Sequence, residues 1–110
     1  MKSKDAVRAL GALAQESRLA IFRRLVEAGP RGMNVGKIMQ HLAIPPATLS
    51  FHLKELTGAG LITAKQEGRF ITYAADFRSM NALVKFMTEN CCGGNPCVAN
   101  ATACKEGETA

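Results

Sequence analysis

The sequence predicts a mostly α-helical protein with a small β-hairpin, in the arrangement of a winged helix-turn-helix. Two short amphipathic segments are joined by a tight break at Pro45-Pro46, as in a helix-turn-helix motif. A β-rich segment with a central glycine follows them directly and predicts the wing. The chain has 110 residues, of which 47% are apolar and 21% charged, and this suits one globular domain.

Two helices are expected ahead of that motif. The first repeats apolar residues at helical spacing, at Val7, Leu10 and Ala14. The second is expected to begin near Ser17, which can serve as its N-cap, and to end at Gly29-Pro30. Its apolar side is expected to comprise Leu19, Phe22, Leu25 and Val26.

The helix-turn-helix itself is expected to begin at residue 34. Asn34 can cap a short first helix. The apolar stripe of this helix is Val35, Ile38, Met39 and Leu42. Pro45 keeps Ile44 out of the α region, whereas Pro46 fits the first turn of the next helix, where a missing N–H costs nothing. That second helix is expected to run to about residue 59, just before Gly60.

A hairpin and one more helix complete the body of the chain. Strands are expected at 61–65 and 69–75, around a turn at 66–68. The last helix is expected to end near Asn90. Its apolar stripe is Met80, Leu83, Val84 and Met87. Residues 1–90 are therefore expected to form one domain, and residues 91–110 a separate tail that carries the cysteines.

Charge and composition narrow the function. Residues 1–90 carry 13 basic and 7 acidic side chains, a balance that favours nucleic acid or another anionic partner. No apolar stretch approaches the ~20 residues of a membrane span. Asp5 and Arg8 interrupt the early apolar run that a signal peptide would need. We therefore expect a cytoplasmic protein whose four cysteines are thiols.

The second helix of the motif has one apolar and one polar face. Leu53 and Leu56 lie within about 40° of Leu49 on a helical wheel and predict a buried stripe. The opposite arc holds Ala47, Thr48, Phe51, Lys54 and Glu55, with Ser50 and His52 on its flanks. Hydroxyls can bond base edges or phosphates and phenylalanine can meet a thymine methyl, so this face suits a major groove. The alternative is that these side chains are solvated or pack on neighbours, as a histidine on a flank often does.

Arg69 follows Gly68 at the expected tip of the wing. From there it can reach a minor groove or a phosphate, although an ordinary solvated arginine explains its position equally well. No phosphate-cradling loop, nucleophile–base pair or cofactor motif occurs in the sequence, so we do not expect an enzyme.

Several segments resemble the ArsR/SmtB family of bacterial metal-responsive repressors. Residues 48–56 (Thr-Leu-Ser-Phe-His-Leu-Lys-Glu-Leu) and 59–62 (Ala-Gly-Leu-Ile) are similar to the family's recognition helix and strand entry. Residues 16–21, Gly68-Arg69 and Tyr73 match its second helix and wing, so the resemblance covers roughly residues 5–90. It implies a homodimer formed by the first and last helices, operator DNA as partner, and DNA contacts from Ser50 and His52.

The inducer sites usual in that family are absent from this sequence. Its best-known arsenic sensors carry Cys-Val-Cys in the first helix of the motif, where this chain has Met-Asn-Val-Gly-Lys at 33–37. Its zinc sensors use His and Asp or Glu on the last helix, where residues 79–90 hold Glu89 and no histidine. An inducer is therefore expected to bind elsewhere.

All four cysteines lie in the last 20 residues. Cys91, Cys92 and Cys97 follow the last helix, and Cys104 lies further on. Soft thiolates select soft ions, and trivalent arsenic or antimony takes three sulfurs in a pyramid. The arrangement resembles atypical ArsR members that bind trivalent arsenic through a Cys-Cys pair and a third cysteine beyond the last helix. We predict a repressor of a metalloid-resistance operon, with As(III) or Sb(III) bound by Cys91, Cys92 and Cys97.

Other uses of these cysteines stay open. A zinc or cadmium sensor would need Cys104 to fold back and complete four thiolates. A vicinal disulfide, or one between Cys91 and Cys97, would make the protein a thiol-redox-responsive repressor. A tail with incidental thiols is the third interpretation.

Overall fold

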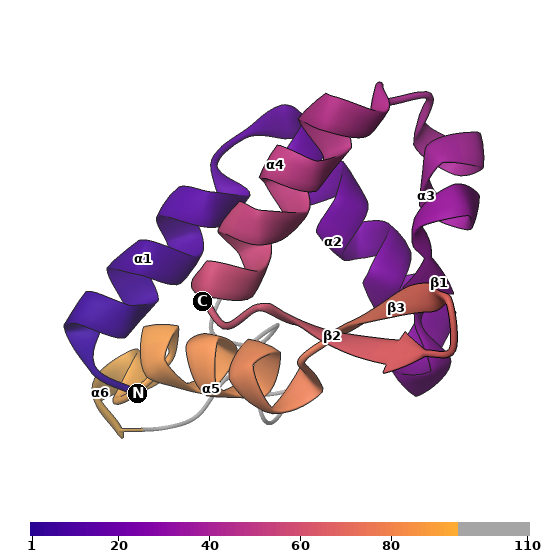
Figure 1. Ribbon diagram of the computed structural model, residues 1–110. Coiled ribbons are helices and arrows are strands. Elements are labelled where there is room, and N and C mark those ends of the chain that lie inside the picture. Colours follow the sequence, from indigo (N-terminus) through magenta and orange to yellow (C-terminus); the bar gives the residue numbers. More distant parts are fainter. Residues whose placement is uncertain (95–110) are drawn as a thin grey trace.

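The computed structural model describes residues 1–94 (Figure 1). In chain order the elements are α1 (Ser3–Leu13), α2 (Glu16–Ala28), the short 3₁₀ turn η1 (Gly29–Arg31), β1 (Met33–Asn34), α3 (Val35–Leu42), α4 (Pro46–Gly58), β2 (Ile62–Glu67), β3 (Phe70–Ala75), α5 (Phe77–Met87) and the single turn α6 (Cys91–Gly94). The predicted mostly helical winged helix-turn-helix is confirmed. Helices α3 and α4 are the motif, and the β2–β3 hairpin is the wing.

The wing is part of a three-stranded sheet rather than an isolated hairpin. The strand order is β1-β3-β2, and both pairings are antiparallel. Strand β1 has only two residues, which is too short for an alternating pattern to predict. Gly32 allows its close approach to β3, because a Cβ at this positive φ of 70° would collide with the carbonyl of Tyr73.

The helix starts show which local signals were informative. Asn34 caps α3 as predicted, with its Oδ1 accepting from the backbone N–H of Lys37 at 2.9 Å. Pro46 occupies the first turn of α4, also as predicted. The predicted cap of α2 is wrong: the helix begins at Glu16, and Gln15 rather than Ser17 caps it by accepting from Arg18 N–H at 2.8 Å. A glutamine is a poor N-cap by type, so this start could not be read from composition.

The end of α5 and the apolar side of α2 also differ from the prediction. Helix α5 ends at Met87 rather than near Asn90. On α2, Leu19 was placed on the apolar side, but its side chain is 44% exposed, whereas Ile21 is fully buried. The large apolar residues of α2 spread over more than one face of the helix, and only its packing against α1, α4 and β3 decides which of them are buried.

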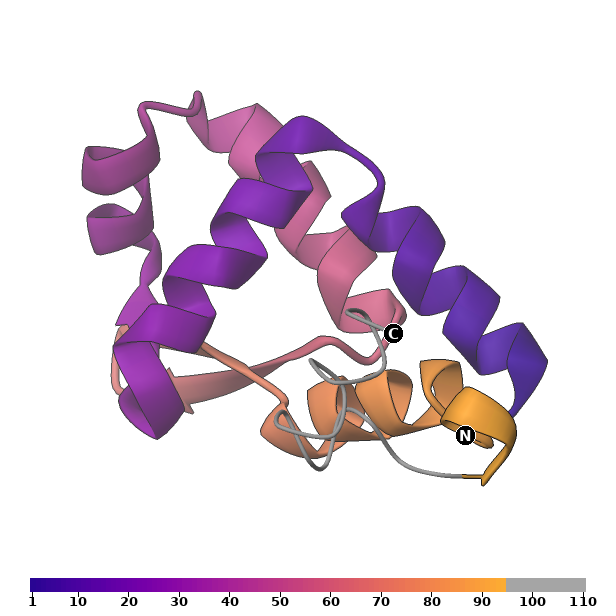
Figure 2. The same cartoon turned by 180° about the vertical axis from the view of Figure 1, so that it is seen from behind.

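The core lies where α1, α2 and α4 meet above the sheet. Helix α2 packs against both α4 and β3, and α1 packs against α2 and α4. Seen from behind, α1 and α2 form the near layer and α4 lies beyond them (Figure 2). The fully buried large side chains are Ile21, Leu25, Ile38, Leu49, Leu56, Leu61 and Ile62. Among the described residues, no helix is long and apolar enough to span a bilayer.

Candidate nucleic-acid interface

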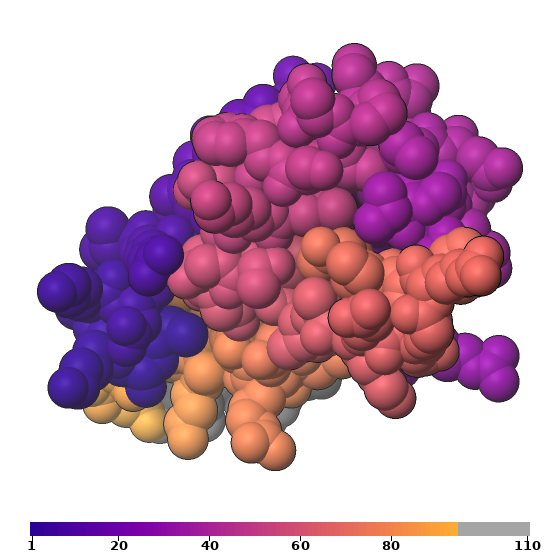
Figure 3. All heavy atoms as spheres, viewed as in Figure 1, coloured from indigo at the N-terminus to yellow at the C-terminus, as the bar shows by residue number. Residues whose placement is uncertain are grey.

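Helix α4 divides into the two predicted faces. Leu49, Leu53 and Leu56 are at most 2% exposed, which confirms the predicted buried stripe. The exposed face carries Thr48, Ser50, Phe51 and Lys54. Phe51 is 55% exposed, so no described segment covers it. Figure 3 shows α4 lying across the surface of the molecule beside the wing.

His52 is the exception among the predicted DNA-binding residues. Its side chain is only 7% exposed, and it is the one polar residue in the buried set of the described chain. Its Nδ1 lies 3.4 Å from Nη1 of Arg18 on α2. The structure therefore places His52, a predicted DNA contact, in the packing between α2 and α4. On the wheel it was a flank position, and only the crossing of α2 decides which way a flank side chain turns.

Arg18 of α2 contacts both α1 and α4, and so links three helices. Its Nε donates to the carbonyl of Ala12, near the end of α1, at 2.7 Å. Its backbone N–H is held by the Gln15 side chain, and its Nη1 faces His52 of α4. No local pattern indicated this role, because 34 positions separate Arg18 from His52 in the chain.

A groove separates the exposed face of α4 from the wing. It has a volume of about 510 Å³, with Ser50 and Lys54 on the helix side and Ile71 and Tyr73 on the sheet side. The structure therefore brings two predicted DNA-binding residues together with two strand residues to which sequence reasoning gave no contact. The alternation of β3 is the signal that could have found them, because residues 71 and 73 share the sheet face towards α4.

Arg69 occupies the tip of the wing and is exposed, as predicted. It follows Gly68, whose φ of 63° makes the turn between β2 and β3. A smaller hollow of about 270 Å³ lies between Arg69, Phe70 and the start of α3. Phe70 is 65% exposed beside it. The wing tip thus offers one cation and one aromatic side chain to any partner that lies along α4.

Cys91 and Cys92 form the turn α6, directly after α5. Their Sγ atoms lie 3.4 Å apart, and Cys92 adopts a left-handed backbone with φ of 55°. Cys97 and Cys104 lie outside the described residues. Within residues 1–94, no group of three His, Cys, Asp or Glu side chains is placed to hold a metal ion.

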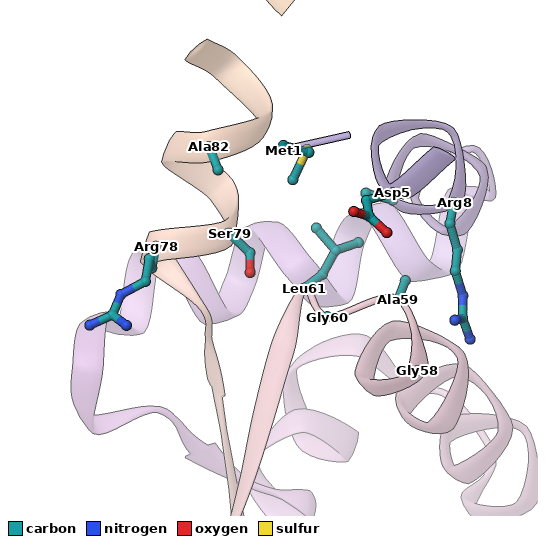
Figure 4. A pocket seen from close by; sticks show the side chains of 11 residues that line it. Met1, Asp5, Arg8, Gly58, Ala59, Gly60, Leu61, Arg78, Ser79 and Ala82 are labelled. Atoms are coloured by element: carbon teal, nitrogen blue, oxygen red, sulfur yellow. The ribbon is translucent and has the colours of Figure 1, made fainter. Parts of the chain in front are cut away.

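A separate cavity of about 430 Å³ lies between α1, α5 and the turn from α4 to β2. Figure 4 shows the side chains of Asp5 on α1 and Ser79 on α5 directed towards it, with Leu61 in its wall. Its lining contains charged, hydroxyl and apolar groups but no thiol.

Comparison with known proteins identifies the class. A family model described as a helix-turn-helix domain matches residues 13–64. A helix-turn-helix-type regulator of Methanocaldococcus jannaschii is 32% identical over 88 residues, which cover 80% of this chain and 97% of the relative. The regulator YceK of Bacillus subtilis is 37% identical over 70 residues, covering 62% and 69% of the two chains. This protein belongs to the helix-turn-helix transcriptional regulators. The predicted non-enzymatic, DNA-binding class is thereby confirmed.

Solved structures place the fold of this regulator with the ArsR type. HlyU from Vibrio cholerae superposes with a TM-score of 0.65 at 26% identity, covering 84% of this chain and 99% of that one. An ArsR-like regulator from Rhodococcus has a TM-score of 0.70 at 22% identity, covering 78% of each chain. The predicted family resemblance is confirmed at the level of fold and regulator class. The identity of the inducer is a separate question.

Proposed function

We propose that this regulator is a homodimeric repressor of a metalloid-resistance operon, and that trivalent arsenic or antimony releases it from operator DNA by binding Cys91, Cys92 and Cys97. The observation that carries the proposal is the 3.4 Å separation of the Cys91 and Cys92 sulfurs, directly after the last long helix. Two thiolates this close can enter one coordination sphere without a rearrangement of the fold.

The chain around this pair suits a third sulfur ligand. Gly93 and Gly94 have positive φ angles of 68° and 106°, which turn the backbone sharply after the pair. Cys97 follows three residues later in the sequence. Arsenic(III) needs only three sulfurs, so this set is complete for it, whereas a structural zinc site would require a fourth ligand.

Exposed apolar side chains support the dimer. Val7 and Leu10 on α1 are 66% and 41% exposed, and Val84 and Met87 on α5 are 47% and 61% exposed. Apolar groups gathered on two helices at one end of a monomer are typical of a surface that a partner covers. A second copy of the chain is the partner that a two-fold operator would select.

The position of the cysteines supplies a route from inducer to DNA. They follow α5, which packs against α1, and α1 in turn packs against the recognition helix α4. A metalloid that reorients the end of α5 would change how the two subunits place their α4 helices. A coupling free energy of about 1–3 kcal/mol lowers DNA affinity by about 5–150-fold, which suffices for derepression.

In this proposal, the exposed face of α4 and the wing contact the DNA. Thr48, Ser50 and Phe51 would meet base edges or thymine methyls, while Lys54 and Arg69 would bind phosphates. The groove lined by Ser50, Lys54 and Tyr73 would follow the DNA backbone between the helix and the wing.

A thiol-redox switch is the second candidate. Vicinal thiols at 3.4 Å can be oxidised together with little movement, and a solved structure of the similar protein HlyU is described as its reduced form. Mass spectrometry after arsenite and after peroxide separates the two candidates, because arsenic adds its own mass and a disulfide removes two hydrogens.

The test is a DNA-binding titration of the full chain with arsenite, antimonite, zinc and cadmium. The duplex is one that the wild type selects from a random library. Serine variants of Cys91, Cys92 or Cys97 should bind DNA normally and fail to be released by arsenite, since a hard oxygen replaces one of three soft ligands. Cys104→Ser is the matched control and should be released nearly normally.

Three outcomes would contradict the proposal. If all four serine variants respond like wild type, arsenic does not act through these thiols. If Cys104→Ser is unresponsive and Cys97→Ser responds, the third ligand is Cys104. Release by zinc or cadmium with no response to arsenite would identify the protein as a divalent-metal sensor.

A further inference from the structure

We infer that Arg18 is a positioning residue for DNA recognition, and that neutral His52 is the acceptor through which it fixes the recognition helix. The inference rests on the proposed function, since it concerns how α4 is held for reading DNA. It assigns His52 a role different from a base contact, and it gives Arg18 a role that the sequence did not suggest.

The first step is the geometry of the arginine. Nε of Arg18 donates to the Ala12 carbonyl at 2.7 Å, and Nη1 lies 3.4 Å from His52 Nδ1. The Gln15 side chain holds the backbone of the same residue at the start of α2. The planar guanidinium directs these donors along fixed, diverging directions. One side chain therefore ties the end of α1 and the start of α2 to the middle of α4.

The second step is the protonation state of His52. A guanidinium has five N–H donors and no acceptor, so the ring nitrogen that faces it must accept. Nδ1 is then unprotonated and the ring carries its proton on Nε2. The neutral Nε2–H tautomer is the state that the bridge requires.

The third step connects the bridge to DNA reading. His52 lies nearly opposite Lys54 on α4, and its ring centroid is 5.8 Å from that of the exposed Phe51. A restraint at His52 fixes the rotation of α4 about its own axis, and this rotation decides which side chains reach the base edges. Loss of the restraint should therefore weaken binding to the operator more than binding to unrelated DNA.

Two variants of His52, in which an amide takes the place of one ring nitrogen or the other, test the inference. In His52→Asn the amide oxygen lies close to the place of Nδ1 and can accept from Arg18; in His52→Gln the amide extends to the place of Nε2 and leaves Arg18 without its acceptor. Operator affinity should stay within about threefold of wild type for His52→Asn and fall about tenfold or more for His52→Gln. A role for Nε2 in contacting DNA predicts the reverse order. Equal losses would show that any change at this site merely disrupts packing. Either result overturns the inference.

Arg18→Lys provides an independent arm. Lysine keeps the charge but cannot direct donors to both the Ala12 carbonyl and His52, so operator affinity should fall about tenfold. Arg23→Lys, at an exposed arginine of the same helix, is the matched control and should bind like wild type. Equal operator affinity of both lysine variants would overturn the inference.

Fluorescence anisotropy on the selected operator and on an unrelated duplex supplies the affinities, and circular dichroism reports folding. If both His52 variants are unfolded, the lysine pair decides. If wild type binds no duplex at all, the proposed function fails. If wild type binds and the predicted orders are absent, only the positioning inference fails.

Discussion

Helices α1 and α4 are both amphipathic, yet α4 buries large apolar side chains whereas α1 buries small ones. Helix α4 buries its leucines, with Leu49 and Leu56 fully inaccessible. Helix α1 buries Ala6, Ala9 and Ala12 and leaves Val7 and Leu10 exposed. Small alanines let α1 approach α2 and α4 closely, so its larger apolar residues remain available for a second surface. A hydrophobic stripe therefore marks an interface, but it does not say whether that interface lies inside the subunit.

Truncation of one leucine on each helix tests whether the two apolar stripes contribute differently to stability. Leu56→Ala should lower the free energy of unfolding by about 2–5 kcal/mol, because it opens a cavity in a fully buried site. Leu10→Ala, at a 41% exposed site, should cost under about 1 kcal/mol at dilutions where the chain is a monomer. Urea denaturation measures both. Losses of similar size would mean that the Leu10 side of α1 also faces the core.

A larger side chain at a buried alanine tests how closely α1 packs on its neighbours. Ala9 is 1% exposed, so Ala9→Leu should force α1 away from its neighbours and cost about 1–3 kcal/mol of stability. Ala14→Leu, just beyond the end of the helix at an exposed position, is the control and should change stability little. A neutral Ala9→Leu, measured by thermal unfolding, would show that α1 is loosely packed.

Substitutions in the exposed stripe of α1 should change self-association rather than the free energy of unfolding. Val7, 66% exposed in the single chain, would be covered in the proposed dimer, so Val7→Asp should raise the dissociation constant of that dimer about tenfold or more by burying an unpaired charge. Gln40→Asp adds the same charge at an exposed position of α3 and should leave association unchanged. Sedimentation equilibrium distinguishes them; an unaffected Val7→Asp dimer would place the interface away from this stripe.

Sequence reasoning predicted most of the fold and only part of the site. Strong local signals, such as the Asn34 cap, the Pro46 start and the leucine stripe of α4, correspond to the observed elements because each acts within one turn of helix. The two-residue strand β1 and the Arg18–His52 contact depend on segments far apart in the chain. The burial of His52 escaped prediction for this reason, since the wheel describes α4 alone and α2 decides which of its flanks is covered.

In the proposed function, the exposed face of α4 reads base sequence while the opposite face holds the helix in place. The most direct test measures the affinities of wild type, Ser50→Ala and Lys54→Ala for the selected operator and for an unrelated duplex, over a series of salt concentrations. Ser50→Ala should lose about 1 kcal/mol, or about fivefold, on the operator and almost nothing on the unrelated duplex. Lys54→Ala should weaken both complexes alike and lower the salt dependence by about one unit. An equal loss on both duplexes for Ser50→Ala would contradict the claim.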